Sequence, residues 1–468
     1  MVQGVRRLQR AVHGLLASNR RRVLLLLFFV VALDYAERGL IGAIGPTLKH
    51  AFGIGNFRLG MLSTALLFVS AGAAVPLGML ADRARRTLLL AGSFVVWAAA
   101  MGALGASTGF WMFFGTSFAL GMAAATSGPV IPSLIGDIVP AARRSRALGI
   151  VNAGVLIGLG IGYVLPPILS RVASWRWNFW LLAAGGAALA LALWRVGEPE
   201  RVGAEGPEEG GEESLVRRLV RERGVEPSPH GLLEHDPSEM SMWEAAKYTV
   251  EVRTDLIVLV ARSVGDFFFQ AIATFAIVFA TGWYGISQGE ANLAILVVGI
   301  GAVAGVVTLS RLSDALLRRG VVNSRILVGS VSYVLSVVAL YPAFISRSLS
   351  VSIPFFAAGA FFLAGARPSL DAIRVDVLVG RLRGRAESIR QVLRSGAEGL
   401  APVSFGALSA ALGGGSLGLE RVFLVLLPLL VLNGLILLLA LRTYQRDVAA
   451  AIVSSQKSPG DHSGTEAR

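Results

Sequence analysis

Long apolar segments recur along this 468-residue chain, and they restrict it to a small number of folds. An α-helix rises 1.5 Å per residue, so roughly 20 apolar residues cross the hydrocarbon core of a membrane as one helix. The apolar segments and the breaks between them predict spans at residues 23–48, 57–81, 87–106, 109–137, 147–170, 177–196, 254–282, 290–312, 325–346, 351–375, 387–412 and 420–442. This pattern predicts an all-α membrane protein with twelve transmembrane helices.

The composition agrees with a protein that crosses the membrane many times. Charged residues make up 16% of the chain and apolar residues 54%, whereas soluble domains carry about 25% charged residues. The absence of cysteine excludes disulfides, thiolate metal sites and cysteine catalysis. Gly53-Ile54-Gly55 lacks the strand, helix and lysine of a nucleotide-binding loop, so we expect no cofactor and no ATP-driven step. The net charge of +13 lies mostly in loops and does not indicate a nucleic-acid partner.

The placement of arginine predicts how the spans are oriented, because loops on the cytoplasmic side carry an excess of basic residues. One set of loops carries arginine clusters at Arg83/Arg85/Arg86, Arg143/Arg144/Arg146, Arg318/Arg319 and Arg381/Arg383/Arg385. The opposite loops carry only Lys49, Arg58, Arg171, Arg176 and Arg347. We therefore expect a multi-pass protein of the cell (inner) membrane with both termini in the cytoplasm. No small-residue cleavage site follows the first apolar run, so we expect it to be an uncleaved span.

The polar intervals divide the chain into five parts. We expect a cytoplasmic amphipathic N-terminus at 1–22, a six-helix bundle at 23–197, a cytoplasmic linker at 198–250, a second six-helix bundle at 251–443 and a disordered cytoplasmic tail at 444–468. The linker begins rich in Glu, Gly and Pro, which favours a flexible segment. Within it, Glu213–Gly224 has apolar residues on one helical side and arginines on the other, which predicts a helix lying on the membrane surface.

The two bundles repeat each other in sequence. A shift of 232 residues maps Asp34 onto Asp266, Arg38 onto Gln270 and Asp82 onto Asp314. A shift of 239 residues maps Asp137 onto Asp376 and Arg146 onto Arg385, with further matches around them. Parallel repeats of this kind place a substrate site between the halves near mid-membrane and allow the halves to rock for alternating access.

Ionisable residues inside the first span are candidates for a coupling site. Asp34, Glu37 and Arg38 lie on one helical face of an otherwise apolar segment. Each such charge costs about 2.5–3.5 kcal/mol or more at mid-membrane, so these side chains are expected to face protein or water. They predict either a coupling site or a structural pair that neutralises itself.

The second bundle contains more charge than the first. Charged or polar residues repeat every four positions in the seventh and eleventh spans, and another group lies in the tenth: Arg262, Asp266, Gln270; Arg390, Arg394, Glu398; Arg367, Asp371, Arg374. For the tenth-span group, neutralisation across helices is the default interpretation. For Asp266, Arg394 and Glu398 we favour a role in a central cavity, because Asp266 is the repeat-mate of Asp34.

These residues support a mechanistic hypothesis. Glu37 first, and Asp34 or Asp266 next, would bind a coupling proton, and movement of Arg38 would change the proton affinity of a neighbouring carboxylate. Arg38 or Arg394 would hold an anionic head group, since guanidinium pairs with phosphate or carboxylate in a bidentate way. The expected substrate-binding set is Arg38, Tyr35, Arg262, Gln270, Arg394, Glu398 and Phe269.

Gly78-Met79-Leu80-Ala81-Asp82-Arg83-Ala84-Arg85-Arg86 resembles the loop signature of the major facilitator superfamily, with Arg85 where the family usually has glycine. Asp137 with Arg146, and Asp376 with Arg385, resemble the family's second loop motif and its repeat. The resemblance implies the major facilitator fold of two pseudo-symmetric six-helix bundles. It also implies a conformational latch that forms when the cytoplasmic side is closed, made of Gly78, Asp82, Arg83, Arg86, Asp137, Arg146, Asp314, Asp376 and Arg385.

Within the superfamily, Asp34-Tyr35-Ala36-Glu37-Arg38 and Ile135-Gly136-Asp137 resemble motifs of Spinster-like lipid transporters. That resemblance implies movement of amphiphiles such as lysophospholipids, commonly linked to protons. Ser117 and Ala124 occupy the fourth-span positions where these relatives carry arginine and glutamate. A pattern like that of the first span also occurs in symporters of organic anions.

Three functions follow as alternatives. The leading one is a monomeric secondary transporter of a lipid-like or hydrophobic organic solute, and the nearest rival is a proton-coupled symporter of a small organic anion. From another class, the protein would be a membrane receptor or scaffold that does not transport, with signalling in the 198–250 linker. We expect no enzyme activity, because no nucleophile–base set is visible.

Overall fold

The computed structural model describes the backbone of residues 2–139, 141–170, 172–196, 215–232, 242–379 and 383–456. Within these ranges, it leaves out the side-chain surroundings of residues 2–20, 75, 82–83, 136–137, 141–146, 148, 152, 230, 242–243, 245–246, 383–390 and 455–456. The described secondary structure consists of helices and contains no strand. The prediction of an all-α protein is confirmed.

The N-terminal half is built from long helices that match the predicted spans. They are α1 (Val2–Ala43), α3 (Asn56–Arg83), α4 (Arg86–Gly105), α5 (Phe110–Ala124) continued by α6 (Ser127–Ile138), α7 (Ala141–Leu169) and α8 (Arg176–Trp194). A short helix, α2 (Gly45–Phe52), follows α1 and ends at Gly53 in the left-handed conformation, with φ of 61°. Pro132 lies inside α6, where proline removes a backbone donor.

The C-terminal half repeats this plan. Its helices are α11 (Arg253–Tyr284), α12 (Gln288–Arg318), α13 (Ser324–Ile345), α14 (Leu349–Val377), α15 (Arg383–Ala411) and α16 (Gly415–Leu438), with a 3-10 turn η3 (Leu439–Arg442) after α16. Ser287 caps α12 through a reciprocal capping box with Glu290. Ten helical segments of the described chain are long and apolar enough to cross a membrane. Helices α1 and α15, which both contain several charged residues, occupy the two remaining predicted spans.

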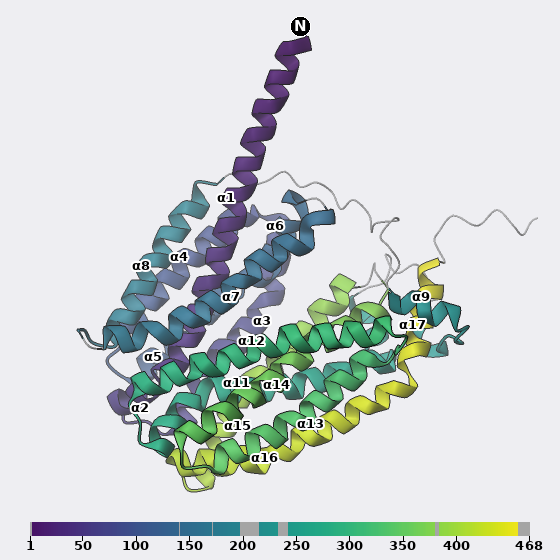
Figure 1. Cartoon of the computed structure of the whole chain (residues 1–468). Coiled ribbons are helices and arrows are strands. Elements are labelled where there is room, and N and C mark those ends of the chain that lie inside the picture. Colours follow the sequence, from purple (N-terminus) through teal and green to yellow (C-terminus); the bar gives the residue numbers. More distant parts are fainter. Residues whose placement is uncertain are drawn as a thin grey trace, which may run out of the picture.

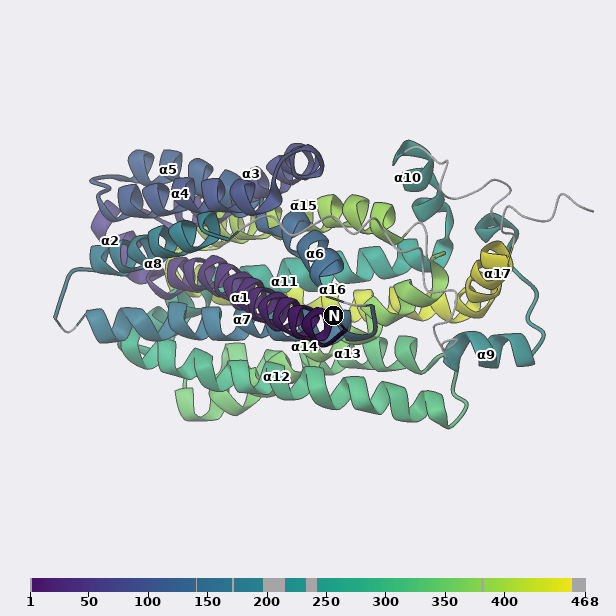
Figure 2. The same ribbon diagram turned by 90° about the horizontal axis from the view of Figure 1, so that it is seen from above.

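The two halves meet at one end of the molecule and diverge at the other (Figure 1). We call the end that holds α2 the α2 end, and the opposite end, which holds the N-terminus and α17 (Tyr444–Gln456), the α17 end. Hydrogen bonds between the halves gather at the α2 end: Asn56 Nδ2 donates to Ser409 Oγ at 2.8 Å, and Thr47 Oγ1 donates to Gln288 Oε1 at 2.6 Å. Seen from above, α4 and α5 lie along one edge and α12 along the other (Figure 2).

The α3–α15 contact holds the α2 end together at close range. A Cβ atom on Gly60 would lie 2.2 Å from the carbonyl oxygen of Pro402, so the two backbones touch at that point. Thr64 Oγ1 donates to the Gly399 carbonyl at 2.7 Å one turn further along α3. Burial lowers the pKa of Lys49, whose ammonium donates to Asn56 Oδ1 at 2.6 Å beside this contact.

The C-terminal tail is partly ordered, which corrects the expectation of disorder over 444–468. Residues Tyr444–Gln456 form α17, and Tyr444, Val448 and Ala450 are fully buried against the C-terminal half. Tyr444 Oη donates to Asp376 Oδ2 at 2.6 Å. Burial and the neighbouring Asp376 carboxylate raise the pKa of the Tyr444 phenol well above its usual value, which keeps it a hydrogen-bond donor.

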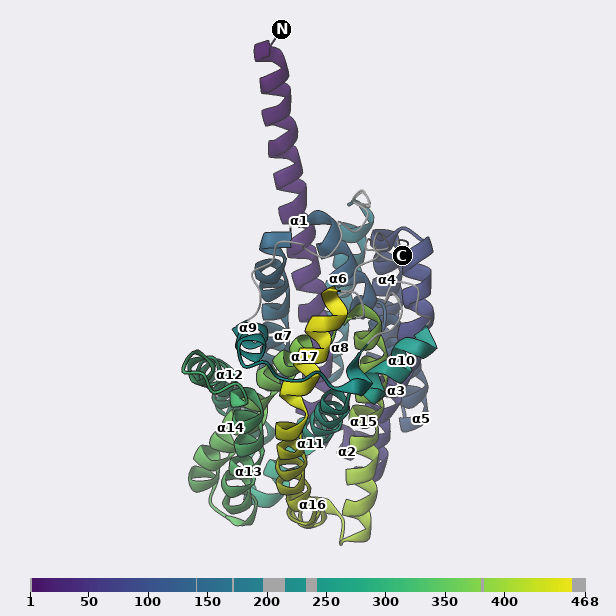
Figure 3. The same cartoon turned by 90° about the vertical axis from the view of Figure 1, so that its right-hand side faces the viewer.

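The linker also packs on protein. Helix α9 (Leu215–Glu222) buries Val216 and Val220, and Arg217 donates to the Asp376 and Leu378 carbonyls at 3.4 and 3.3 Å. The predicted helix is therefore present, but its apolar side contacts the C-terminal half, where the sequence indicated a membrane surface. The turn η1 (Pro229–Gly231) and α10 (Met242–Glu251) join α9 and α17 at this end (Figure 3).

Candidate functional site

Helix α1 is held rigidly in the N-terminal half by glycines of α7. Cβ atoms on Gly154, Gly158 and Gly162 would lie 2.6, 2.2 and 2.4 Å from carbonyl oxygens of Phe28, Ala32 and Ala36. Only glycine allows this approach, which is the small-residue packing common between membrane helices. The contact fixes the turn of α1 that carries the predicted charged residues.

The acids of α1 are buried without adequate partners. Glu37 is 0% exposed, and no described residue donates a hydrogen bond to either of its carboxylate oxygens. Asp34 is also buried beside Ser127 at the start of α6, and its Oδ1 has no hydrogen-bond partner among the described residues. Ionised carboxylates in such surroundings are costly, so this turn of α1 stores unfavourable electrostatic energy unless a proton or a cation is present.

Arg38 has a buried Nε that makes no hydrogen bond among the described residues. Its guanidinium lies over the ring of Tyr35, with 4.9 Å from Cζ to the ring centroid, which places both predicted residues side by side. Glu37, Asp34 and Glu398 of α15 are the acids that act on it electrostatically. Arg38 is therefore shared between the acids of its own half and an acid of the other half.

Asp266 of α11 forms the centre of an ion-pair cluster in the C-terminal half. Its carboxylate is 2% exposed and lies 2.8 Å from Arg262 Nε, 2.8 Å from Arg367 Nη2 and 3.9 Å from Arg394 Nε. The three arginines come from α11, α14 and α15. An acid with three cationic partners has little need of a proton, so Asp266 is a weaker candidate for proton coupling than Glu37.

The same cluster continues towards accessible groups. Arg262 Nη1 lies 3.4 Å from Asp371 Oδ2, and Arg394 Nε lies 3.4 Å from Glu398 Oε1. The side chains of Asp371, Arg367 and Arg394 are 48%, 27% and 24% exposed, unlike that of Asp266. The partly exposed guanidinium groups of Arg367 and Arg394 are thus held in place by the buried carboxylate of Asp266.

Aromatic rings lie next to these arginines. Cζ of Arg367 is 4.0 Å from the centroid of Phe269, a cation–π contact. Phe267 packs on Phe405 with ring centroids 5.6 Å apart. Gln270, the repeat-mate of Arg38, is partly buried on the next turn of α11. The site therefore places guanidinium groups and apolar rings side by side.

The charged turns lie close to the closed end of the molecule. A Cβ atom on Gly42 would lie 2.5 Å from the Ala273 carbonyl oxygen, so α1 and α11 cross there. Arg38 precedes Gly42 by one helical turn, or about 6 Å. The charged groups of both halves thus lie just inside the point where the halves meet.

The predicted latch is only partly visible. Gly78 packs against Pro129 of α6, Arg86 is buried with its Nη1 donating to Ser133 Oγ at 2.7 Å, and Asp314 is exposed on α12. Asp376 pairs with Arg325 of α13 and Tyr444, within its own half. Asp82, Arg83, Asp137, Arg146 and Arg385 lie outside the residues whose surroundings the structure describes.

Sequence reasoning missed two members of the site. The predicted neutralisation across helices is present for the tenth-span group, because Arg367 pairs with Asp266, Asp371 with Arg262, and Arg374 Nε with Asp255 Oδ1 at 2.9 Å, all on α11. What the sequence did not indicate is the contact of Arg367 with Phe269, which makes it part of the site. Ser127 gave no signal in sequence. Arg367 precedes Asp371 by one helical turn, so the two residues lie on the same face of the helix, and Asp371 is the partner of Arg262. This spacing is the sequence signal that could have identified Arg367.

Comparison with known proteins gives a consistent result. The Major Facilitator Superfamily profile matches residues 27–227. Protein spinster homolog 1 of Bos taurus and of Homo sapiens are each 28% identical over 200 residues, which is 42% of this chain. The aligned part spans only 38% of those relatives' length.

Solved structures share the fold along most of the chain. A bacterial homologue of the human lysosomal transporter Spinster, in an inward-facing and occupied conformation, superposes with a TM-score of 0.71 at 18% identity. The match covers 92% of this chain and 98% of that one. The nucleoside transporter NupG has a TM-score of 0.66 at 14% identity, covering 91% of this chain and 99% of its own. At these identities the likeness concerns the fold.

Proposed function

We propose that this chain is a Spinster-like member of the major facilitator superfamily and that it is a secondary transporter. It works by alternating access and moves an amphiphilic, lipid-like solute with an anionic head group, driven by a proton gradient. We also propose that the α17 end is cytoplasmic, as the arginine-rich loops indicate. The closed α2 end and the diverging α17 end then correspond to an inward-facing state.

The observation that carries the proposal is the buried carboxylate of Glu37, which has no hydrogen-bond donor among the described residues. A proton on Glu37 removes the cost of a bare buried charge, and loss of that proton restores an anion that attracts Arg38. Protonation of Glu37 thus decides whether Arg38 is held within α1 or is available to Glu398 and the substrate. Ala124 cannot carry a proton, so in this proposal the proton is carried by α1.

The C-terminal cluster supports an amphiphilic solute. Arg367 and Arg394 are accessible and positioned by Asp266, and guanidinium groups bind phosphate or carboxylate oxygens in a bidentate way. Phe269 lies directly beside Arg367 and offers an apolar surface for the adjoining chain of the solute. An amphiphile would therefore place its anionic head group at the arginines and its apolar chain along the aromatic rings.

The test is uptake into liposomes that contain the purified protein. Labelled lysophospholipid is compared with a panel of small organic anions, with and without a pH gradient. Uptake of the lysophospholipid that rises with the gradient supports the proposal. Gradient-driven uptake of only the small anions identifies the rival symporter, and absence of all uptake, with charge substitutions in the spans having no effect, identifies a receptor or scaffold.

Glu37→Gln tests the coupling role itself. One pH unit supplies about 1.4 kcal/mol per proton, enough for about tenfold accumulation of one solute per proton. We expect Glu37→Gln to abolish this accumulation while exchange of labelled for unlabelled solute continues, because glutamine resembles a permanently protonated acid. Glu222→Gln, which changes an exposed acid on α9, is the matched control and should keep full accumulation. Unchanged pH dependence in Glu37→Gln removes Glu37 from the mechanism.

A further inference from the structure

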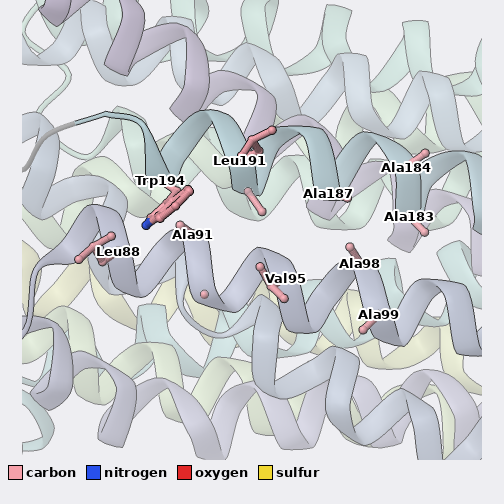
Figure 4. A pocket seen from close by; sticks show the side chains of 12 residues that line it. Leu88, Ala91, Val95, Ala98, Ala99, Ala183, Ala184, Ala187, Leu191 and Trp194 are labelled. Carbon is pink, nitrogen blue, oxygen red and sulfur yellow. The ribbon is translucent and has the colours of Figure 1, made fainter.

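An apolar groove runs between α4 and α8 of the N-terminal half (Figure 4), and no residue of the charged site lines it. The cavity has a volume of about 820 Å³ and is lined only by Ala, Gly, Val, Leu and Trp side chains. Leu88, Val95 and Ala99 line it from α4, and Ala183 and Trp194 from α8. The many small side chains leave a channel between the two helices.

The length of the groove along α4 is close to the thickness of the hydrocarbon part of one membrane leaflet. Leu88 and Ala99 are eleven residues apart on α4, which corresponds to about 17 Å along the helix axis. Half of the hydrocarbon core is about 15 Å. Leu88 and Trp194 lie at its α17 end, so the groove begins at the membrane surface on that side and ends near mid-membrane.

Two arginines flank the mouth of the groove. Arg85 immediately precedes α4 and Arg195 immediately follows α8, and both side chains are exposed. Neither has a side-chain partner among the described residues, whereas the neighbouring Arg86 is buried against Ser133. Trp194 is 66% exposed at the same end, where indoles favour the head-group region.

We propose that the groove binds an anionic phospholipid of the leaflet at the α17 end. One acyl chain lies along α4 and α8, and the phosphate contacts Arg85 and Arg195. The apolar lining, the one-leaflet depth and the paired positive charges at the mouth match the two parts of such a lipid. A helix of a second copy would match neither the depth nor the charges. This site faces outward and is separate from the transport site, so the inference does not depend on the proposed substrate.

The first experiment measures lipid retention by native mass spectrometry of the full chain. Dioleoyl-phosphatidylglycerol is titrated against dioleoyl-phosphatidylcholine, and we expect one preferentially retained anionic lipid. Gly92→Phe fills the groove, and because a Cβ at Gly92 meets nothing within 4 Å, the helix packing is preserved. This variant should lose the retained lipid. Gly102→Phe is the matched control on the same helix, since Gly102 is equally open but lies outside the groove.

The charges at the mouth are tested separately. A basic residue near a membrane surface contributes enough that Arg85→Gln with Arg195→Gln should weaken binding of the anionic lipid about 30-fold. Arg442→Gln with Arg446→Gln removes the same charge from exposed positions in the C-terminal half and should have little effect.

A second measurement does not depend on these variants. Vesicles of phosphatidylcholine with a minor fraction of brominated phosphatidylglycerol should quench Trp194, seen as the difference between the native chain and Trp194→Phe. Retention of the lipid by Gly92→Phe, equal retention of both lipids, a dimer that covers the groove, or no quenching of Trp194 would each overturn the proposal. Transport by Gly92→Phe should persist, which separates this test from that of the transport function.

Discussion

At the scale of single residues, charge inside the membrane is treated in two different ways. Asp266 is surrounded by Arg262, Arg367 and Arg394, and such a cluster is stable because each buried charge has a partner. Glu37 has no donor among the described residues. The first arrangement fixes a binding surface, and the second leaves a group whose protonation changes its surroundings. We therefore propose a structural role for Asp266 and a proton-coupling role for Glu37.

This assignment predicts the stability of two variants. Asp266→Asn leaves Arg367 without its acid, and breaking a buried pair on one side costs about 3–5 kcal/mol of unfolding free energy. Asp371→Asn changes a half-exposed partner of Arg262 and should cost less than about 1 kcal/mol. Denaturant unfolding of both variants in the same detergent measures the difference. Equal losses would show that Asp266 is not the centre of the cluster.

At the scale of helices, we expect close backbone contacts at the α2 end to decide which state is populated. Gly60 of α3 meets Pro402 of α15, and Gly406 of α15 meets Asn56 of α3, at distances that exclude a Cβ atom. These contacts have to separate when the α2 end opens. They stabilise the observed state without involving any charged residue of the site.

Gly60→Ala should shift the protein toward a state that is open at the α2 end. Overpacking costs about 1–3 kcal/mol, which changes the ratio of the two states about 5- to 150-fold. Because the chain has no cysteine, spin labels at Val172→Cys and Val351→Cys report the distance between the halves without background. Both positions are exposed at the α2 end. We expect a longer distance in Gly60→Ala.

The matched control is Gly72→Ala on the same helix, where a Cβ atom meets nothing within 4 Å. Its distance distribution should equal that of the parent. An unchanged distance in Gly60→Ala, accompanied only by lower stability, would mean that this contact supports the fold and does not set the state.

At the scale of the whole molecule, the linker and the tail belong to one half. Ser228 N donates to the Arg446 carbonyl at 3.1 Å, and Thr254 N donates to Asp447 Oδ2 at 3.0 Å. Helices α9, α10 and α17 therefore form a layer on the C-terminal half at the α17 end. When the halves rock, we expect this layer to move with α11–α16 as one body.

The proposed orientation predicts from which side of the membrane a reagent can label each end of the protein. A cysteine at Val172, which is 83% exposed at the α2 end, should react with a membrane-impermeant maleimide added to intact cells. A cysteine at the exposed Arg446 of α17 should react only after permeabilisation. The reverse pattern would invert the topology, and with it the identification of the inward-facing state.

The sequence by itself determined the twelve spans, the internal repeat and the positions of charge along each helix. These properties follow from hydrophobicity and helical period, which are local and therefore visible in one chain. It also predicted that Asp34 and Asp266 occupy equivalent positions in the two halves, because the shift of 232 residues maps one onto the other.

Only the tertiary structure decided which charges meet. Arg367 is 101 residues from Asp266, and Asp376 pairs with Arg325 and Tyr444 from two other helices. Electrostatic energy depends on the distance between charges in space, and helical spacing constrains that distance only within one helix. The order of α17, the docking of α9 and the closure of the α2 end likewise depend on contacts between distant segments, which no local pattern contains.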